Sequence, residues 1–232
     1  DVAASGNKTD VVKAFVDNCR KQKIAPCFYY CLWGGAFNPN PKARETILAQ
    51  LYELAHNYGE IPYFWIDMNV WEPANLSPQE IYDAIKSQRP KTIVICNQGT
   101  TNGVKVNSFP TDILNGEITT PVETGHQPVK EVGGKKYYLP FEFAPVSQAR
   151  DYASVSTTPY GRGAWFTYGE GRQIPPSKPF AAKDLNEWIR QATKRGASNV
   201  LLSIGPDFTG RMREGDVKVL NELAKLLKKP AP

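Results

Sequence analysis

The sequence contains few residues of the kinds that bind metals or form histidine-dependent catalytic centres. Only two of its 232 residues are histidines, His56 in a helical stretch and His126 in a polar loop. The four cysteines form no CxxC pair and show no metal-ligand spacing, so we expect free, buried thiols. A histidine-based metal site or a Ser-His-Asp triad is therefore not expected, and we predict neither a metal nor a cofactor.

Clusters of like-charged residues and long apolar runs are also scarce. The 28 basic and 23 acidic residues give a net charge of +5 but are spread over the whole length, apart from a basic tail at Lys225, Lys228 and Lys229. Nucleic acid is not an expected partner, because a basic face or stripe is missing. No apolar run is long enough to span a bilayer. The chain begins at Asp1 without a charged-then-apolar leader, so we expect that a leader was removed or a longer protein was cut.

Strand-like runs alternate with amphipathic helices along the chain. Apolar residues at helical spacing predict helices at Asp10–Lys23, Thr46–Tyr58, Ser77–Ser87, Lys183–Arg195 and Glu214–Leu227. Apolar and aromatic runs predict strands at Ala25–Leu32, Tyr63–Ile66, Thr92–Cys96, Tyr137–Phe143 and Asn199–Ile204. The alternation predicts an α/β fold with a parallel sheet, in one domain that spans residues 1–232. A closed (β/α)8 barrel needs eight strands in about 250 residues, so five strands suggest an open or incomplete barrel.

Asp67 is the first candidate functional residue. It directly follows the buried run Tyr63–Ile66 and lies between Trp65 and Trp71. An ionised carboxylate is costly to bury unpaired, and in barrel enzymes the carboxyl end of a strand carries the chemistry. The alternative is that Asp67 only caps a loop amide.

Two further carboxylates end or follow strand-like segments. Glu117 and Glu142 could converge with Asp67 at one rim of the sheet. Two converging carboxylates are the minimal equipment for glycoside hydrolysis. Aromatic side chains that could stack on a sugar are Tyr30, Trp33, Trp65, Trp71, Trp165 and Phe166, although each of them could instead serve ordinary packing. The irregular stretches 97–134 and 144–179 are long enough to be functional loops.

Three segments resemble the α-L-fucosidases of glycoside hydrolase family 29. The stretch Trp65-Ile66-Asp67 with Trp71 is similar to the family's nucleophile segment. Residues 195–212 (RGASNVLLSIGPDFTGRM) resemble its final barrel strand, and Asp10-Val11-Val12 with Phe28-Tyr29-Tyr30 resembles an early segment. The resemblance implies a (β/α)8-like, TIM-type barrel and a retaining hydrolase that releases α-L-fucose from glycans.

The resemblance also implies roles for individual residues. Asp67 would be the nucleophile and Trp65 a wall of the sugar pocket. The segment from Asp112 to Glu117 resembles the family segment that carries the acid/base, which makes Glu117 the favoured acid/base and Glu142 the alternative. Substrate contacts are expected at Trp65, Trp71, Tyr30, Glu142 and Trp165.

Some expected parts of the family pattern are missing. Gln98-Gly99 stand where the family usually has an arginine, and the paired-histidine motif of the early strands and the C-terminal β-sandwich are absent. The resemblance therefore implies the later part of a catalytic barrel, incomplete at its N-terminal end, which a missing segment or a partner chain would complete. It further implies a secreted, periplasmic or lysosomal parent protein. Two alternatives stay open: a non-catalytic sugar-binding relative or inactive fragment, and a generic α/β domain whose carboxylates only cap loops.

Overall fold

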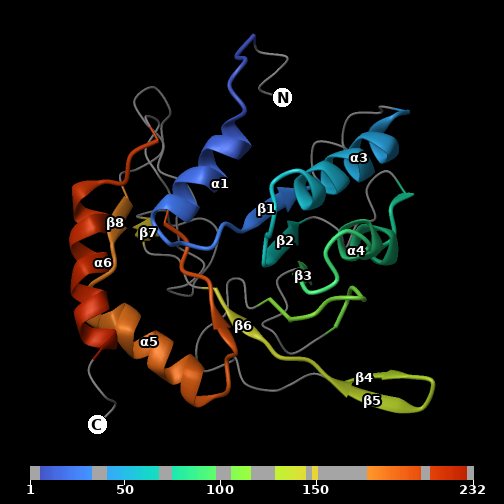
Figure 1. Cartoon of the computed structure of the whole chain (residues 1–232). Helices are drawn as coiled ribbons and strands as arrows, with labels where there is room; N and C mark the ends of the chain where they lie inside the picture. The colour runs from blue at the N-terminus through green and yellow to red at the C-terminus, as the bar shows by residue number, and fades with distance from the viewer. Residues whose placement is uncertain are drawn as a thin grey trace. The chain divides into compact units, whose positions relative to one another are not determined.

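The computed structural model describes residues 6–32, 41–67, 75–97, 106–115, 129–144, 148–150, 177–204 and 210–228. The chain divides into two compact units, one made of Asp1–Gly99 with Asn107–Leu114 and the other of Thr100–Val106 with Asn115–Pro232. Figure 1 labels the helices and strands of both units. The predicted mixed α/β class is confirmed. The assignment of all 232 residues to one domain stays a prediction.

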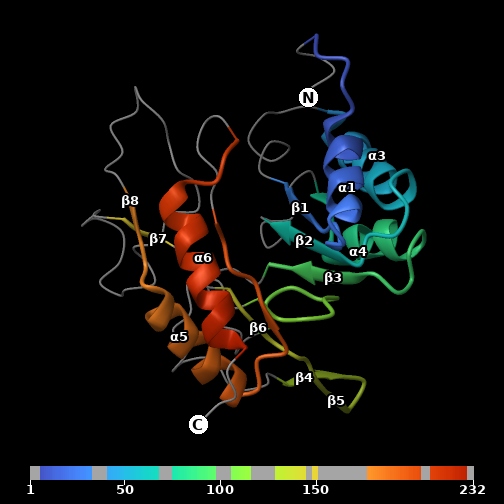
Figure 2. The same cartoon turned by 60° about the vertical axis from the view of Figure 1, so that its left-hand side comes forward.

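The first unit is built on a parallel three-stranded sheet. Its elements follow in the order α1 (Val11–Lys21), β1 (Phe28–Cys31), α3 (Ala43–His56), β2 (Tyr63–Asp67), α4 (Pro78–Lys86) and β3 (Ile93–Cys96). The strands pair in the order β1-β2-β3, with Cys31 opposite Asp67 and Ile66 opposite Cys96, and Figure 2 shows them side by side. The three helices and three strands predicted for this part of the chain are therefore confirmed.

The helix starts are set by residues that satisfy free backbone amides. Asp10 caps α1, because its carboxylate accepts a hydrogen bond from the Lys13 amide at 2.8 Å. Ser77 and Glu80 form a capping box at the start of α4, and Pro78 occupies the first helical position, where no amide donor is needed.

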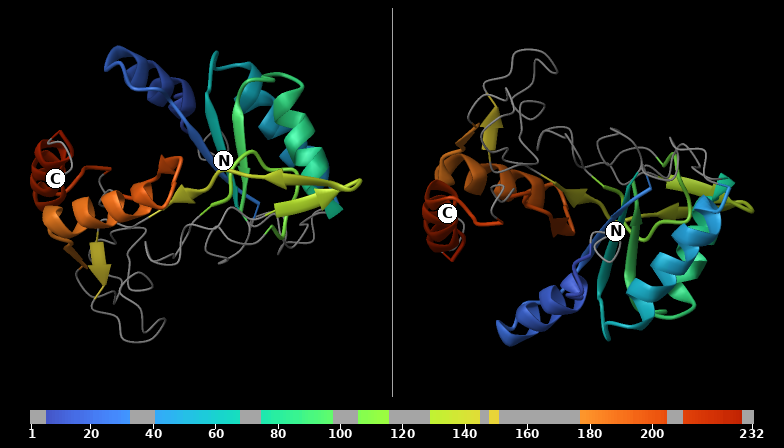
Figure 3. Two further views of the ribbon diagram at one scale, coloured as in Figure 1. Left: turned by 90° about the horizontal axis from the view of Figure 1, so that it is seen from below. Right: turned by 90° about the horizontal axis from the view of Figure 1, so that it is seen from above.

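The two faces of the sheet have different surroundings. On one face, side chains such as Phe64 and Ile66 join a buried core with α1, α3 and α4, and Figure 3 shows α3 and α4 together on that side. Because side chains alternate along a strand, Trp65 and Asp67 belong to the other face. There Trp65 packs with Ile95 and Ile113 in a smaller apolar cluster. The central strand is thus buried on both faces, as its sequence predicted.

The two edges of this sheet differ as well. The outer edge of β3 is covered by the segment around Asp112, whose amide donates to the Val94 carbonyl at 2.8 Å. The outer edge of β1 pairs with no other strand in the part of the chain that the structure describes. Four large apolar side chains of α1, β1 and the turn between them are exposed: Val11 (43%), Phe15 (49%), Ile24 (60%) and Tyr29 (59%).

The second unit contains short two-stranded sheets and a pair of packed helices. Strands β4 (Val129–Val132) and β5 (Lys135–Tyr138) form an antiparallel hairpin, β6 (Glu142–Phe143) pairs in parallel with β9 (Asn199–Val200), and β7 (Gln148–Arg150) pairs with β8 (Ser177–Pro179). Helices α5 (Ala182–Lys194) and α6 (Glu214–Leu227) match the predicted ranges to within one residue and bury Leu185 and Leu223 between them.

The predicted strand Tyr137–Phe143 is wrong as a single element. Its first part belongs to the hairpin β4–β5, and its last two residues form β6, which pairs with a different strand. Pro140 lies between the two parts and has no N–H to donate to a ladder, so one continuous strand is disfavoured there. Gly133 and Gly134 make the hairpin turn with φ of +59° and +75°, values that favour glycine.

The strands that the structure describes form one three-stranded and three two-stranded sheets, and a (β/α)8 barrel is not shown among them. None of the helices it describes combines the length and the apolarity needed to cross a membrane. The four cysteines are free, as predicted, but the prediction that they are buried holds only for Cys96, since Cys27 and Cys31 are exposed and Cys19 is half-buried.

Candidate active site

Asp67 is the last residue of β2, at the carboxyl end of the central strand of the parallel sheet. Its carbonyl accepts a hydrogen bond from the Leu32 amide at 3.1 Å, so the ladder between β1 and β2 continues up to this residue. The side chain is half-buried and lies on the face of the sheet that α3 and α4 do not cover. A carboxylate at the carboxyl end of parallel strands has the position at which α/β enzymes bind ligands and react with them.

Both carboxylate oxygens of Asp67 accept hydrogen bonds from neighbouring strands. The Tyr29 hydroxyl, from β1, donates to Oδ2 at 2.5 Å. The Asn97 side-chain amide, directly after β3, donates Nδ2–H to Oδ1 at 2.7 Å. Donors from the two strands that flank β2 therefore fix the plane of the carboxylate.

Tyr29 also joins this carboxylate to an aromatic pair. Its ring stacks on that of Trp65, with centroids 5.6 Å apart and an interplanar angle of 22°. Trp65 is 6% exposed, whereas Tyr29 is 59% exposed, so the tyrosine forms the accessible side of the pair. Partial burial, followed by the hydrogen bond to Asp67, raises the pKa of Tyr29 well above its usual value of 10. The hydroxyl consequently stays protonated and remains a donor at any pH near neutrality.

Tyr30, for which the sequence predicts a sugar contact, lies on the opposite face of the sheet. Its hydroxyl donates to Gln50 Oε1 of α3 at 2.6 Å, and its ring packs against the helix-side core. Burial raises the pKa of Tyr30 to about 12. The tyrosine on the face of Asp67 is the preceding residue, Tyr29.

Sequence reasoning missed both donors to Asp67. Asn97 could have been found with the rule that singled out Asp67, since each is a polar residue at the end of a buried strand. Tyr29 carries no such signal, because two adjacent tyrosines offer either face until the register of the strand is known.

Glu142 lies in the second unit, at the start of β6, and is fully buried. It pairs in register with Asn199 of β9, whose side-chain amide donates to Glu142 Oε2 at 2.7 Å. This contact ties the two short strands together through their side chains as well as their backbones.

Three of the predicted site residues, Glu117, Trp71 and Trp165, lie outside the described residues. Within the described ranges, no three or more histidine, cysteine, aspartate or glutamate side chains gather in a way that could hold a metal ion.

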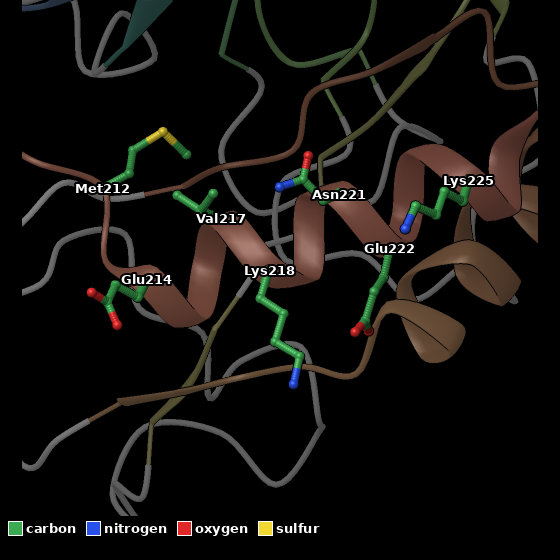
Figure 4. A pocket seen from close by; sticks show the side chains of 7 residues that line it. All are labelled: Met212, Glu214, Val217, Lys218, Asn221, Glu222 and Lys225. Atoms are coloured by element: carbon green, nitrogen blue, oxygen red, sulfur yellow. The ribbon is translucent and has the colours of Figure 1, made fainter.

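A separate shallow hollow of about 460 Å³ lies on the surface of α6. Figure 4 shows the side chains that line it: Met212, Glu214, Val217, Lys218, Asn221, Glu222 and Lys225. None of the predicted site residues is among them, so this hollow is not part of the candidate active site.

Comparison with known proteins gives structural matches only. No family model matches the sequence, and no curated protein matches it. The α-L-fucosidase isoenzyme 1 from Paenibacillus thiaminolyticus matches with a TM-score of 0.66 and 17% identity, over 94% of this chain and 52% of that one. A glycoside hydrolase 29 family member from an unknown rumen bacterium matches with a TM-score of 0.63 and 19% identity, over 95% and 40%. The α-L-fucosidase AlfC from Lactobacillus casei, in complex with its α-L-fucose product, matches with a TM-score of 0.57 and 18% identity, over 95% and 65%.

These matches confirm the structural resemblance to α-L-fucosidases that the sequence motifs predicted. Identities of 17–19% establish a shared fold and do not establish a shared reaction. The chain spans about half the length of the solved structures it matches.

Proposed function

We propose that this chain is part of a retaining glycoside hydrolase that releases α-L-fucose from glycans, with Asp67 as its nucleophile. The observation that carries the proposal is the position of Asp67, at the carboxyl end of a central parallel strand, with one hydrogen bond to each carboxylate oxygen and a stacked Tyr29–Trp65 pair beside it. The fold shared with α-L-fucosidases supports the choice of sugar.

In the proposed reaction, an oxygen of Asp67 attacks the anomeric carbon while the bond from that carbon to the leaving oxygen breaks. Glu117 donates a proton to the leaving oxygen, and a covalent fucosyl-enzyme forms. Glu117 then takes a proton from a water molecule that attacks the same carbon, and the electron pair of the ester bond returns to Asp67. Retention by this route requires the two carboxyl groups to lie about 5–5.5 Å apart.

The surroundings of Glu142 support Glu117 as the acid/base. A general acid has to reach the leaving oxygen directly or through one water molecule. The carboxyl group of Glu142 is fully buried and is bonded to Asn199, so it would have to leave this contact before it could serve. We therefore assign Glu142 a structural role, in place of the substrate contact expected from the sequence.

For substrate binding, we propose that Tyr29 takes the place of Tyr30 and acts together with Trp65. The Tyr29 ring offers an accessible aromatic surface, and its hydroxyl lies 2.5 Å from the Asp67 carboxylate. An apolar sugar face can stack on such a surface. Trp71 and Trp165 stay proposed contacts. The substrate would be a fucosylated glycan or glycoconjugate, and since such glycans lie outside the cytosol, we propose a secreted, periplasmic or lysosomal parent.

We also propose that the unpaired edge of β1 is where further strands complete a barrel. Two observations support this: the exposed apolar side chains Val11 and Phe15 of α1 and Ile24 of the turn that leads into β1, and the roughly twofold greater length of the matching solved structures. A sheet edge with an exposed apolar border favours pairing with another segment. The segment would come from the parent protein or from a partner chain.

Kinetics of the full-length parent test the assignment of the nucleophile. Asp67→Ala should abolish turnover with every leaving group, because no covalent intermediate can form. Asp17→Ala, in an exposed ion pair with Lys13 on α1, is the matched control and should leave turnover unchanged. Retained activity in Asp67→Ala would overturn the proposal.

A non-catalytic sugar-binding relative is the second candidate. It is favoured by Gln98-Gly99 at the expected position of an arginine and by the small number of histidines. Binding of fucosylated glycans by the full-length parent, without release of fucose over long incubation, would select this function instead.

A further inference from the structure

The two side chains that donate hydrogen bonds to Asp67 differ in how exposed they are. Asn97 follows β3 and is 6% exposed, so its amide is enclosed near Oδ1. Tyr29 is largely exposed, and its hydroxyl reaches Oδ2 from a ring that Trp65 supports on one side. Replacing Tyr29 by phenylalanine would therefore remove the hydroxyl and keep the stacked ring.

We propose that Tyr29 is a positioning residue that stabilises Asp67 as a leaving group and so controls the second step of the reaction. The inference rests on the proposed function, since it takes Asp67 as the nucleophile. Its basis is the 2.5 Å hydrogen bond from the Tyr29 hydroxyl to a carboxylate that must lose its charge and then regain it.

The charge on Asp67 changes in opposite directions in the two steps. When an Asp67 oxygen bonds to the anomeric carbon, the carboxylate becomes a neutral ester, and a hydrogen bond from Tyr29 opposes this change slightly. When water attacks the same carbon, the ester bond breaks, its electron pair returns to the carboxylate, and the same hydrogen bond stabilises the developing charge. A donor to the charged form therefore favours breakdown of the intermediate over its formation.

The resulting kinetic signature differs from that of a general loss of structure. In Tyr29→Phe, the fucosyl-enzyme should form at a nearly normal rate and break down about 10- to 100-fold more slowly, the range expected for one hydrogen bond to a charged group. With 4-nitrophenyl fucoside, kcat and KM should fall together, kcat/KM should stay within a few-fold, and a burst of nitrophenol should precede the steady state. A damaged fold would lower kcat/KM and give no burst.

Tyr30→Phe is the matched control for this experiment. Tyr30 is the neighbouring residue on the same strand, and its ring lies on the helix-covered face. The substitution Tyr30→Phe removes a tyrosine hydroxyl in the same way as Tyr29→Phe. Its kinetics should match those of the unaltered enzyme. A fall in kcat/KM equal to the fall in kcat in Tyr29→Phe, without a burst, would overturn the inference.

A spectroscopic test reports on the same contact without any turnover. The titratable groups that act on Tyr29 are Asp67 and Cys31. With 3-fluorotyrosine at position 29, the fluorine NMR titration should move to lower pH in Asp67→Asn, because the loss of the carboxylate charge makes the phenolate easier to form. Cys31→Ser should cause a smaller change.

The two tests separate the two proposals. An unchanged titration in Asp67→Asn would overturn the inference even if the enzyme hydrolyses fucosides. A shifted titration in a protein that has no fucosidase activity would refute the proposed function and leave the contact between Tyr29 and Asp67 established.

Discussion

The amide of Val94, in β3, donates a hydrogen bond to the carboxylate Oδ2 of Asp112 at 2.8 Å, and the amide of Asp112 donates to the Val94 carbonyl at the same distance. The Asp112 carboxylate also accepts a hydrogen bond from the Tyr82 hydroxyl at 2.6 Å and forms an ion pair with Lys86 Nζ at 2.7 Å, and both residues belong to α4. Asp112 therefore joins β3, α4 and the start of the segment that leads to Glu117. Its contacts give it a structural role in the fold, although it lies in the segment that was selected for its resemblance to the acid/base segment of the fucosidases.

Asp112→Ala should lower the free energy of unfolding by about 1–3 kcal/mol. The reason is that the Val94 amide, in a fully buried residue, loses its acceptor, and an unsatisfied buried donor costs about that much. Urea denaturation followed by circular dichroism measures the change. Asp17→Ala removes an exposed ion pair with Lys13, which is worth about 0.2–0.5 kcal/mol, and provides the control. Equal effects of the two substitutions would contradict the anchoring role.

The elements of the first unit could be predicted because their signals are local. A capping box with proline at the first helical position identified α4, and a short apolar run ending at Asp67 identified β2. Both patterns depend on residues that are neighbours in the sequence. The position of Asp67 at the end of a central strand follows from the same run.

Pairing between distant segments was beyond the sequence patterns. Tyr29 and Tyr30 are equally strand-like, and only the register in which Cys31 faces Asp67 decides which of them shares its face. The run that ends at Phe143 reads as one strand, but Tyr138 pairs with Val129 in a hairpin, whereas Glu142 pairs with Asn199, far away along the chain. Burial of Glu142 beside Asn199 depends on the same pairing.

The thiols of the first unit should differ in their reaction with iodoacetamide. Burial and the nearby Asp112 carboxylate raise the pKa of Cys96 to about 12, so at pH 8 almost none of it is the reactive thiolate. Partial burial and the neighbouring Cys19 raise the pKa of Cys27, so it should react more slowly than free cysteine. Its side chain is still accessible to the reagent, so it should react faster than Cys96. Timed alkylation and peptide mass spectrometry measure these rates. In urea the difference should disappear; fast alkylation of Cys96 in the folded chain would show that β3 is open to solvent.

The exposed border of β1 should make the isolated 232-residue chain associate. Phe15 of α1 and Ile24 of the turn before β1 are 49% and 60% exposed, β1 has an unpaired edge among the described strands, and soluble proteins seldom leave such a surface uncovered. Light scattering after size-exclusion chromatography should show species larger than a monomer, and Phe15→Lys with Ile24→Lys should shift them toward the monomer. Tyr52→Lys, at a 47% exposed position on α3, should have no such effect. A monodisperse monomer that melts cooperatively would refute the proposed completion of the sheet at this edge.

The choice between Glu117 and Glu142 as acid/base can be decided by dependence on the leaving group. Natural glycans have poor leaving groups, so their leaving oxygen needs protonation in the first step. The 4-nitrophenolate of 4-nitrophenyl fucoside is a good leaving group and departs without protonation. In the full-length parent, Glu117→Ala should therefore lose far more activity on fucosylated glycans than on the aryl fucoside. Glu222→Ala, on the exposed surface of α6, should match the unaltered enzyme on both substrates.

Glu142→Ala should give a different result, because its carboxyl group is fully buried and accepts from the Asn199 amide at 2.7 Å. Removal of this carboxylate leaves a cavity and takes the acceptor from the half-buried Asn199 amide, at a cost of about 1–3 kcal/mol. Activity should then fall by the same factor on both substrates and in proportion to the loss of folded protein, which a melting curve of the same sample measures. If Glu142→Ala selectively spares the aryl fucoside while Glu117→Ala does not, then Glu142 is the acid/base, and its contact with Asn199 has to open during the reaction.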